Sequence, residues 1–515
     1  MIHFQKFKNV ISLVCFSFYS VLIFAQASKP PVFSDPDRLK KIEATFPVID
    51  KIYKDYAEQN HFPGLVYGIV VDGTLVHTGS VGYTDLKDKT EASSKSAFRI
   101  ASMSKSFTAM AILKLRDEGK LKLDDPAFLY IPEMKGLKYL TKDASPVTIR
   151  NLLTHSAGYP EDNPWGDRQL ANTDQELLDI YKKGVSFSND PGLGYEYSNL
   201  GFATLGYIIK KVSGKSYEEY ITENILRPLG MTHTYWEYTI VPKELLAHGY
   251  RWIDSQWVEQ PLLHDGSYGA MGGMITTIED FSKYVALHLS AWPPRDDNET
   301  GPVKRSSIRE MQYPWDVNGF NASAKTATGR SYPFVSAYCY GLRWRKYIDA
   351  TTAVGHTGGL PGFGSEWTIY PEFGVGVISF ANLTYANAGS VNNQVADTLL
   401  RLSGVKPRQL PPSDILTQRR NELMKLLPYW SNAQTSGIFA SNFFMDYFPE
   451  KLKAEATAIF AKAGKTILTG DVVPENQLRG YFIVHGEQAN VKVSFTLTPE
   501  NPALIQAYHI DLIAK

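Results

Sequence analysis

Residues 102–119 read SMSKSFTAMAILKLRDEG, and this stretch decides how the rest of the chain is interpreted. Apolar residues from Phe107 to Leu115 lie around most of the circumference of a helix, and Gly119 is a typical residue just beyond a helix C-terminus. A helix that is apolar on nearly all sides belongs in a protein interior. The sequence therefore predicts a central, buried helix with Ser102 at its start.

Strand patterns lie on both sides of a long helical middle. Residues 64–83 (GLVYGIVVDGTLVHTGSVGY) predict a β-hairpin that turns at Asp72-Gly73. Residues 351–384 predict further strands, two of them antiparallel and joined at residues 371–374. Further helices are expected near 173–183, 200–212, 217–226 and 278–289. This order favours an α/β (α+β) fold in which both ends of the segment share one antiparallel sheet flanked by helices, beside a mainly helical region.

Three prolines, Pro407, Pro411 and Pro412, mark a change of domain. After them Ser413 can cap a helix that reaches about Leu427. A second helical region is expected over 442–463 with a break at Pro449. Three strand-like runs follow, the clearest being 491–497. We therefore expect a first domain over 28–405, a linker and helix over 406–428, and a small α+β domain over 429–515 whose role and partner no motif indicates.

The N-terminal residues have the pattern of a secretory signal peptide over 1–27. Lys6 and Lys8 precede an apolar run over 10–24, and the small residues Ala25 and Ala27 follow it. The run is shorter than the roughly 20 residues that span a bilayer, so we expect no stable membrane insertion. The mature protein is then exported, periplasmic or extracellular, and Cys339 is its one cysteine.

The overall charge and the scattered histidines exclude several classes of function. Lysine plus arginine and aspartate plus glutamate both number 53, so no field of one sign exists to attract nucleic acid. The 11 histidines are scattered, and neither H-E-x-x-H nor paired-cysteine spacing occurs. We expect no nucleic-acid partner, no metal and no cofactor.

Ser102 and Lys105 form an S-x-x-K pattern at the predicted helix start. Side chains three residues apart on a helix share a face, so the hydroxyl and the amine can meet. A serine at a helix start also lies among free N–H groups, which stabilise a tetrahedral oxyanion, and a neutral Lys105 can take its proton. Ser403 and Lys406 have the same spacing, but Gly404 and the following Pro407 prevent a helix there.

Two further patterns can complete a site. In Tyr197-Ser198-Asn199 the tyrosine can serve as general base and then acid, and the asparagine amide can hold a substrate carbonyl. In His356-Thr357-Gly358-Gly359 a strand offers polar side chains, close backbone approach, and a Gly359 N–H that can form an oxyanion hole with that of Ser102. Each pattern has a second copy, at 385–387 and 77–79, which we interpret as structural because of its surroundings.

The order and context of these three patterns resemble the serine β-lactamase and penicillin-binding-protein superfamily. The resemblance is to the class C β-lactamase-like family with its DD-peptidase, D-aminopeptidase and esterase relatives, and it extends over about 46–404. It implies an acyl-enzyme at Ser102, catalytic Lys105 and Tyr197, and substrate binding by Asn199 and residues 356–358. Four other segments carry it: TIRNLLTHSAG (148–158), PLGM (228–231), AMGGM (270–274) and YGLRW (340–344). His155, within the first of these segments, is interpreted as structural.

One departure from the family bears on the substrate. Class C β-lactamases typically have lysine at the position of His356, and histidine is mostly uncharged near neutral pH. The resemblance therefore favours a D-Ala-type carboxypeptidase or peptidase, or an esterase, acting on a small-molecule or peptide acyl donor. A β-lactamase proper, a slowly deacylating penicillin-binding sensor and an inactive scaffold are the alternatives.

Overall fold

The structure is a computed structural model that describes residues 29–515. The signal peptide expected over 1–27 lies outside the described residues. The chain divides into two compact units, one over Pro30–Leu410 and one over Pro411–Lys515. Among the described residues, no helix has the length and apolar character needed to cross a membrane.

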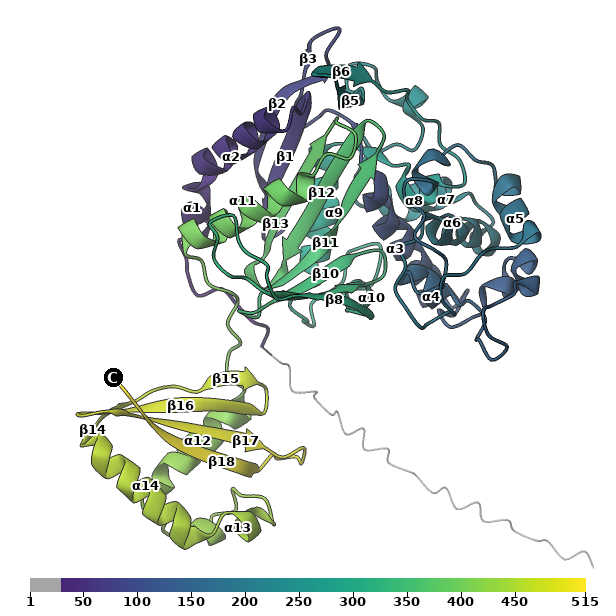
Figure 1. Ribbon diagram of the computed structural model, residues 1–515. Coiled ribbons are helices and arrows are strands. Elements are labelled where there is room, and N and C mark those ends of the chain that lie inside the picture. Colours follow the sequence, from purple (N-terminus) through teal and green to yellow (C-terminus); the bar gives the residue numbers. More distant parts are fainter. Residues whose placement is uncertain (1–28) are drawn as a thin grey trace, which may run out of the picture. The chain divides into compact units, whose positions relative to one another are not determined.

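A nine-stranded antiparallel sheet forms the centre of the first unit (Figure 1). Its order is β3-β2-β1-β13-β12-β11-β10-β9-β8. Because β1 pairs with β13 from Leu65–Ala381 to Val71–Val375, the first and last strand segments share one sheet, as predicted. The strands are β1 (Gly64–Val71), β2 (Thr74–Asp85), β3 (Thr90–Glu91), β8 (Asp316–Asn321), β9 (Phe334–Tyr338), β10 (Arg343–Tyr347), β11 (Thr352–Leu360), β12 (Phe363–Tyr370) and β13 (Val375–Ala381).

The hairpin turns where the sequence predicts it. Asp72 and Gly73 have φ values of 51° and 83°, the left-handed backbone that a two-residue hairpin turn requires. Every residue of β1 is buried, because helices cover both faces of the sheet. In Figure 1, α9 (Ile278–Ser290) lies behind the strands, whereas α1 (Arg38–Glu43), α2 (Phe46–Gln59) and α11 (Ala388–Ser403) lie on the other face.

The helical region packs around α3 (Ser104–Asp117), which begins as a 3-10 turn over Ala101–Met103. Its apolar residues from Phe107 to Leu115 are buried, so the prediction of a central helix is confirmed. The other helices here are α4 (Ile149–Leu153), α5 (Asp174–Lys183), α6 (Asn199–Ser213), α7 (Tyr217–Ile221) with a π-helical turn (Thr222–Leu226), α8 (Gly269–Gly272) and α10 (Arg305–Met311). Two short strand pairs, β4 (Phe98–Arg99) with β7 (Ile275–Thr276) and β5 (Tyr250–Ile253) with β6 (Gln256–Glu259), complete the unit.

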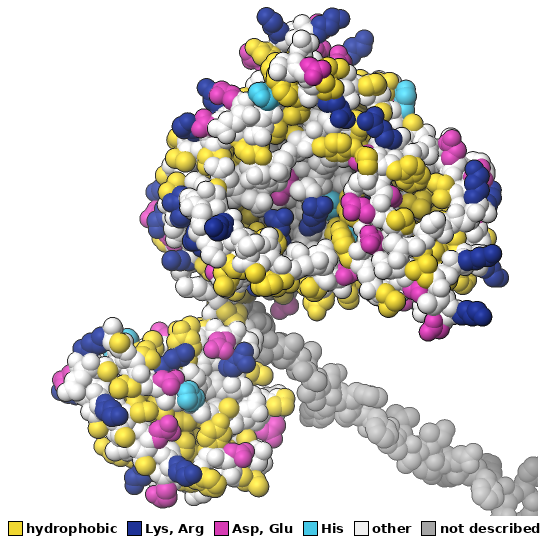
Figure 2. Space-filling view, viewed as in Figure 1, with side chains coloured by type: hydrophobic (Ala, Val, Ile, Leu, Met, Phe, Trp, Pro, Cys, Tyr) yellow, Lys and Arg dark blue, Asp and Glu magenta, His cyan; other side chains and the backbone are white. Residues whose placement is uncertain are grey.

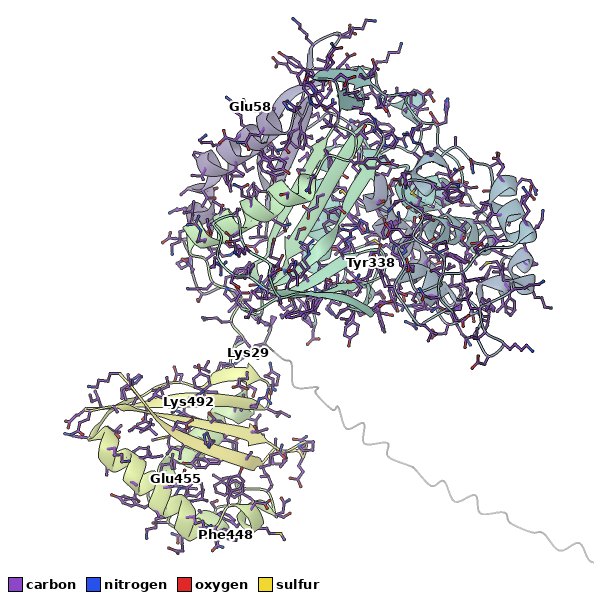
Figure 3. The ribbon with its side chains drawn as sticks, viewed as in Figure 1. Lys29, Glu58, Tyr338, Phe448, Glu455 and Lys492 are labelled. Carbon is purple, nitrogen blue, oxygen red and sulfur yellow. The ribbon has the colours of Figure 1, made fainter. Side chains whose placement is uncertain are left out.

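The second unit is a separate α+β domain with its own core. Ser413 caps α12 by accepting a hydrogen bond from the Leu416 N–H, and Leu416 and Leu423 are buried in this core, so the helix that we grouped with the linker belongs to the domain. Three strands were predicted in this unit, but five form. The two additional strands, β14 and β15, are short and mostly exposed. Lys492 and Glu455, labelled in Figure 3, lie on β17 and α14. The elements are α12 (Asp414–Leu426), α13 (Phe443–Asp446), α14 (Pro449–Ala463), β14 (Thr466–Thr469), β15 (Val473–Asn476), β16 (Arg479–Gly486), β17 (Asn490–Leu497) and β18 (Ile505–Ile513).

Candidate active site

A cavity of about 390 Å³ lies between the edge of β11 and the start of α3. Most of its lining comes from segments that are far apart in the sequence and that the sheet and α3 bring together. Its lining residues are Ser102, Asn163, Pro164, Asp167, Tyr197, Arg343, Thr357, Gly359 and Tyr385. The three sequence patterns therefore contribute to one cavity.

Ser102 and Lys105 meet as their spacing predicts. The Lys105 Nζ lies 3.1 Å from the Ser102 Oγ, 2.7 Å from the Asn199 Oδ1 and 3.0 Å from the Met271 carbonyl oxygen. The lysine is completely buried, and the serine is 8% exposed. A neutral amine in this geometry donates to Asn199 and Met271, and its lone pair is then directed at the serine hydroxyl.

Burial lowers the pKa of Lys105 to about 7, because the charged ammonium is removed from water. Arg343 lowers the pKa further by repulsion, whereas the carboxylates of Asp167 and Asp162 raise it. Near neutral pH a large fraction of Lys105 is therefore the free amine. This is the form that can accept the proton of Ser102.

Asn199 lies deeper than the sequence suggested. Its side chain is fully buried, its Oδ1 accepts from Lys105, and its Nδ2 donates to the Asn163 Oδ1 at 2.6 Å. Both amide atoms are thus occupied within the protein, so the residue expected to hold a substrate carbonyl instead positions Lys105. Asp162 holds this loop by accepting from the N–H groups of Asn199 and Leu200 at the start of α6.

Tyr197 lines the cavity beside Ser102. Burial raises the pKa of Tyr197 above its ordinary value, while a hydrogen bond with Ser102 acts in the opposite direction. The His155 ring lies 4.2 Å from the Tyr197 ring, and the His155 Nδ1 accepts from the Ser198 N–H at 3.1 Å. His155 therefore has a structural role: it holds the loop that carries Tyr197.

His356, which was expected to bind substrate, does not face the cavity. His356 is 2% exposed and does not line the cavity. Its Nδ1–H donates to the Thr357 carbonyl, so its Nε2 accepts from the Tyr338 hydroxyl at 3.0 Å. Burial and the neighbouring cations lower the pKa of His356 well below its usual range. Figure 3 labels Tyr338, which lies where the strands meet the helical region.

The residues that follow His356 in this pattern differ in their surroundings. Thr357 and Gly359 line the cavity, as expected. Gly358 instead packs against the segment before Ser102, where a Cβ at this position would lie 2.2 Å from the Ile100 carbonyl oxygen. Only glycine permits this approach of β11 to the serine turn.

Five cavity residues were not identified as site residues from the sequence. Arg343 belongs to the 340–344 segment, which was used only as a mark of resemblance. Tyr385 belongs to the pattern that we interpreted as structural, yet it lines the cavity and donates to the Asp167 Oδ2 at 3.1 Å. Asn163, Pro164 and Asp167 lie in a loop that matches no motif.

The second S-x-x-K pattern, at Ser403 and Lys406, and the second H-T-G pattern, at 77–79, lie outside the cavity, as their surroundings suggested. The Ser403 hydroxyl donates to the Leu399 carbonyl at the end of α11. His77 pairs with Asp50 at 2.6 Å on β2. Within residues 29–515, no group of three or more histidine, cysteine, aspartate or glutamate side chains is arranged to hold a metal ion.

Comparisons with known proteins show what this chain is similar to. Protein flp of Staphylococcus aureus (strain N315) is 31% identical over 337 residues, which cover 65% of this chain and 62% of that protein. Unguisins hydrolase ungD' of Aspergillus campestris is 28% identical over 348 residues, covering 65% of this chain and 61% of that protein. The chain thus spans less than two thirds of the length of these relatives.

A solved structure and a family model extend the comparison. The octameric penicillin-binding protein homologue from Pyrococcus abyssi has a TM-score of 0.58 at 23% identity, over 93% of this chain and 98% of that one, which shows a shared fold. The family model described as Beta-lactamase matches residues 49–400, and this range contains Ser102, Lys105, Tyr197 and Gly359. The chain therefore belongs to the Beta-lactamase family, within the superfamily of serine β-lactamases and penicillin-binding proteins.

Proposed function

We propose that the protein is an exported serine hydrolase that forms an acyl-enzyme at Ser102 and acts as a D-Ala-type carboxypeptidase or peptidase. The observation that carries this proposal is the buried Lys105 amine 3.1 Å from the Ser102 Oγ, with its pKa lowered to about 7. A nucleophile needs such a neighbouring base, and this one is available at neutral pH.

In the proposed reaction, Lys105 takes the Ser102 proton as Oγ forms a bond to the acyl carbon. The resulting oxyanion accepts hydrogen bonds from the N–H groups of Ser102 and Gly359. Because the pKa of Tyr197 is raised, its hydroxyl is protonated and can donate to the leaving atom. Lys105 returns the proton to Tyr197 as the leaving group departs, and water then hydrolyses the acyl-serine.

Arg343 supplies the positive charge that His356 does not. Its side chain is exposed and lines the cavity, and a guanidinium is a cation with five N–H donors. A C-terminal carboxylate on the leaving group is the natural partner for such a charge. This supports carboxypeptidase activity more than esterase activity. It also supports β-lactamase activity as the second candidate, because β-lactams carry a carboxylate.

Turnover of three substrates tests these functions: an acyl-D-alanyl-D-alanine peptide, a p-nitrophenyl ester and a chromogenic cephalosporin. We expect catalytic release of D-alanine and slow cephalosporin turnover. A cephalosporin burst of one equivalent that then stops, without peptide turnover, would identify a sensor. Cephalosporin turnover that exceeds peptide turnover would identify a β-lactamase.

Replacement of Arg343 by glutamine is expected to lower kcat/KM for the D-alanyl peptide by about 10- to 100-fold, because hydrogen bonds to a charged partner contribute about 1.5–3 kcal/mol. Hydrolysis of the uncharged p-nitrophenyl ester should change little, because it has no carboxylate. Steady-state kinetics on both substrates measures this difference. An equal loss on both would mean that Arg343 serves the chemistry or the fold, and no loss on either would remove the carboxylate argument.

Export is the other part of the proposal, and residues 1–27 support it by composition alone. We expect the secreted protein to begin at Ser28. N-terminal sequencing of protein from the periplasmic or culture fraction measures this directly. A cytoplasmic protein that retains Met1 would contradict it.

A further inference from the structure

We call the cavity lined by Ser102 and Tyr197 the catalytic cavity. A second cavity, of about 700 Å³, lies beside it in the first unit. It is bounded by the 324–334 segment, by β10 and by α11, and we call it the basic cavity. Four cationic side chains line it, compared with two carboxylates. The cations are Lys325, Arg330, Arg345 and Arg401, and the carboxylates are Asp349 and Asp397.

The carboxylates of the basic cavity are already engaged. The Asp397 Oδ1 pairs with the Arg330 guanidinium at 3.1 Å. Asp349 accepts from the Tyr332 hydroxyl at 3.0 Å and from the Thr351 N–H at 3.1 Å. Positive charge therefore remains in excess within the cavity.

Only part of the Arg345 guanidinium is hydrogen-bonded within the described part of the chain. Its Nη1 lies 3.4 Å from the Asn393 Oδ1, Tyr347 is its other hydrogen-bonding neighbour, and its guanidinium lies 5.2 Å from the centre of the Phe334 ring. No ion pair involves it in the part of the chain that the structure describes. Glu366 on β12, two strands away, attracts Arg345, but that carboxyl is buried and bound by Thr368 and Asn392. Burial raises the pKa of Glu366 to about 7, so it neutralises Arg345 only in part.

The two cavities share one strand. Arg343 lines the catalytic cavity and Arg345 the basic cavity. Since they are two residues apart on β10, their side chains leave the same face of the sheet, roughly 7 Å apart along the strand. They pair with Gly355 and Ala353 of β11. Figure 2 shows the first unit hollowed on this face, with Lys or Arg side chains inside the hollow.

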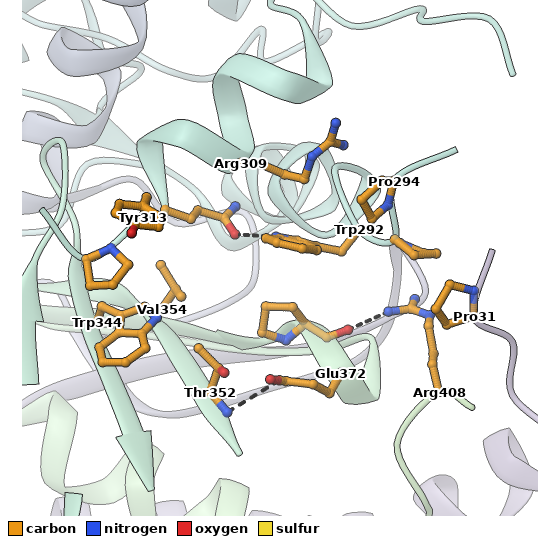
Figure 4. A pocket seen from close by; sticks show the side chains of 14 residues that line it. Pro31, Trp292, Pro294, Arg309, Tyr313, Trp344, Thr352, Val354, Glu372 and Arg408 are labelled. Carbon is orange, nitrogen blue, oxygen red and sulfur yellow. Dashed lines mark hydrogen bonds between the residues drawn. The ribbon is translucent and has the colours of Figure 1, made fainter. Parts of the chain in front are cut away.

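Another cavity lies on the opposite face of β10. A cavity of about 370 Å³ there is lined by Trp344, Val354 and several prolines (Figure 4). Two of its polar side chains bind within the chain: Arg408 donates to the Pro371 carbonyl, and the Trp292 Nε1–H donates to the Gln312 Oε1 at 2.7 Å. This cavity has two cationic side chains, Arg309 and Arg408, compared with four in the basic cavity.

The leaving group is the part of the substrate that faces the basic cavity. Tyr197 must face the leaving atom to protonate it, and Arg343 is the cation whose charge acts most strongly on Tyr197. A leaving group that binds Arg343 therefore extends along β10, away from Ser102. The next cation in that direction is Arg345.

From this geometry we propose that the basic cavity is a subsite for a second carboxylate on the leaving group. The proposal rests on the function proposed above and narrows its substrate. The α-carboxylate of the released residue binds Arg343, and a carboxylate on its side chain binds Arg345. The preferred leaving group is then a D-amino acid with an acidic side chain.

Two isosteric peptides test the subsite: acyl-D-alanyl-D-glutamate and acyl-D-alanyl-D-glutamine. We expect kcat/KM to be about 10-fold or more higher for the glutamate peptide, because the Arg345 guanidinium meets an opposite charge there and only a neutral amide in the other peptide. Arg345→Gln should remove most of this preference by lowering the glutamate value, and should change the glutamine value much less. Arg345→Lys keeps the charge and should keep part of the preference, and thermal melting of both variants checks folding. Arg309→Gln, in the cavity on the opposite face, is the matched control and should change neither value.

The outcomes separate the two proposals. Equal hydrolysis of both peptides by the unmodified enzyme overturns the subsite and leaves the proposed function intact. If neither peptide is hydrolysed although acyl-D-alanyl-D-alanine is, the subsite fails and the proposed function stands; if none of the three peptides is hydrolysed, the proposed function fails, and the subsite fails with it. A preference for an acidic residue in the acyl part, lost in Arg345→Gln, would place the carboxylate on the wrong side of the scissile bond and would also overturn the proposal.

Discussion

Replacement of Ser102 by alanine is expected to abolish covalent labelling and to lower kcat by roughly 10⁴- to 10⁶-fold, the loss typical of removing a serine nucleophile. The Oγ is the atom to which Lys105 is directed at 3.1 Å, and it lines the catalytic cavity. A fluorophosphonate probe followed by peptide mass spectrometry locates the label, and steady-state hydrolysis of the D-alanyl peptide measures the loss.

Ser403→Ala is the matched control for this variant. Ser403 has the same S-x-x-K spacing, but its hydroxyl is buried and donates to the Leu399 carbonyl at the end of α11. We expect full activity and unchanged labelling. Labelling that persists in Ser102→Ala, or that maps to Ser403, would refute the assignment of the nucleophile.

Replacement of Lys105 by alanine is expected to slow acylation by roughly 10²- to 10⁴-fold, the usual contribution of a positioned base. The variant should still fold, because a buried amine with a lowered pKa is replaced by an apolar side chain. Lys114→Ala, on the same helix, is the control, since the Lys114 ammonium donates to the Pro302 carbonyl away from the cavity. Pre-steady-state acylation rates and thermal melting separate a catalytic from a structural effect. A Lys105→Ala enzyme that folds and acylates at the normal rate would exclude Lys105 as the base.

The pH dependence of acylation tests the same assignment through the sign of the effect. The active form of Lys105 is the neutral amine, so the rate should rise with pH through about 7 and level off above it. Asp167 raises the pKa of Lys105 by attraction, so Asp167→Asn should lower that pKa and move the rise to lower pH. A rate that falls as pH rises through this range would mean that the ammonium is the active form, and a shift to higher pH in Asp167→Asn would contradict the electrostatic account.

Local signals in the sequence were sufficient for the β1–β2 hairpin, for β11 to β13 and for five helices of the first unit. Other elements of this unit, among them α2, α11 and β8 to β10, were not predicted. The hairpin at Asp72-Gly73 needs only a turn that tolerates left-handed backbone, and α5 is capped by Thr173, which accepts from the Glu176 N–H. The i, i+3 spacing of Ser102 and Lys105 is likewise local, and the structure confirms their approach. The short strands β14 and β15 were missed because four residues are too few to establish an alternating pattern.

By itself, then, the sequence determined the elements with clear local patterns, the family and the serine–lysine pair, because each of these depends on residues close together in the chain. Only the tertiary structure decided which side chains face the substrate. It turned His356 away from the catalytic cavity, bound Asn199 to Lys105, and placed Arg343 and Tyr385 in the lining. The physical reason is that the face on which a strand side chain lies, and the groups it meets there, depend on how distant strands pair and what packs on them, and these pairings join residues separated by up to several hundred positions.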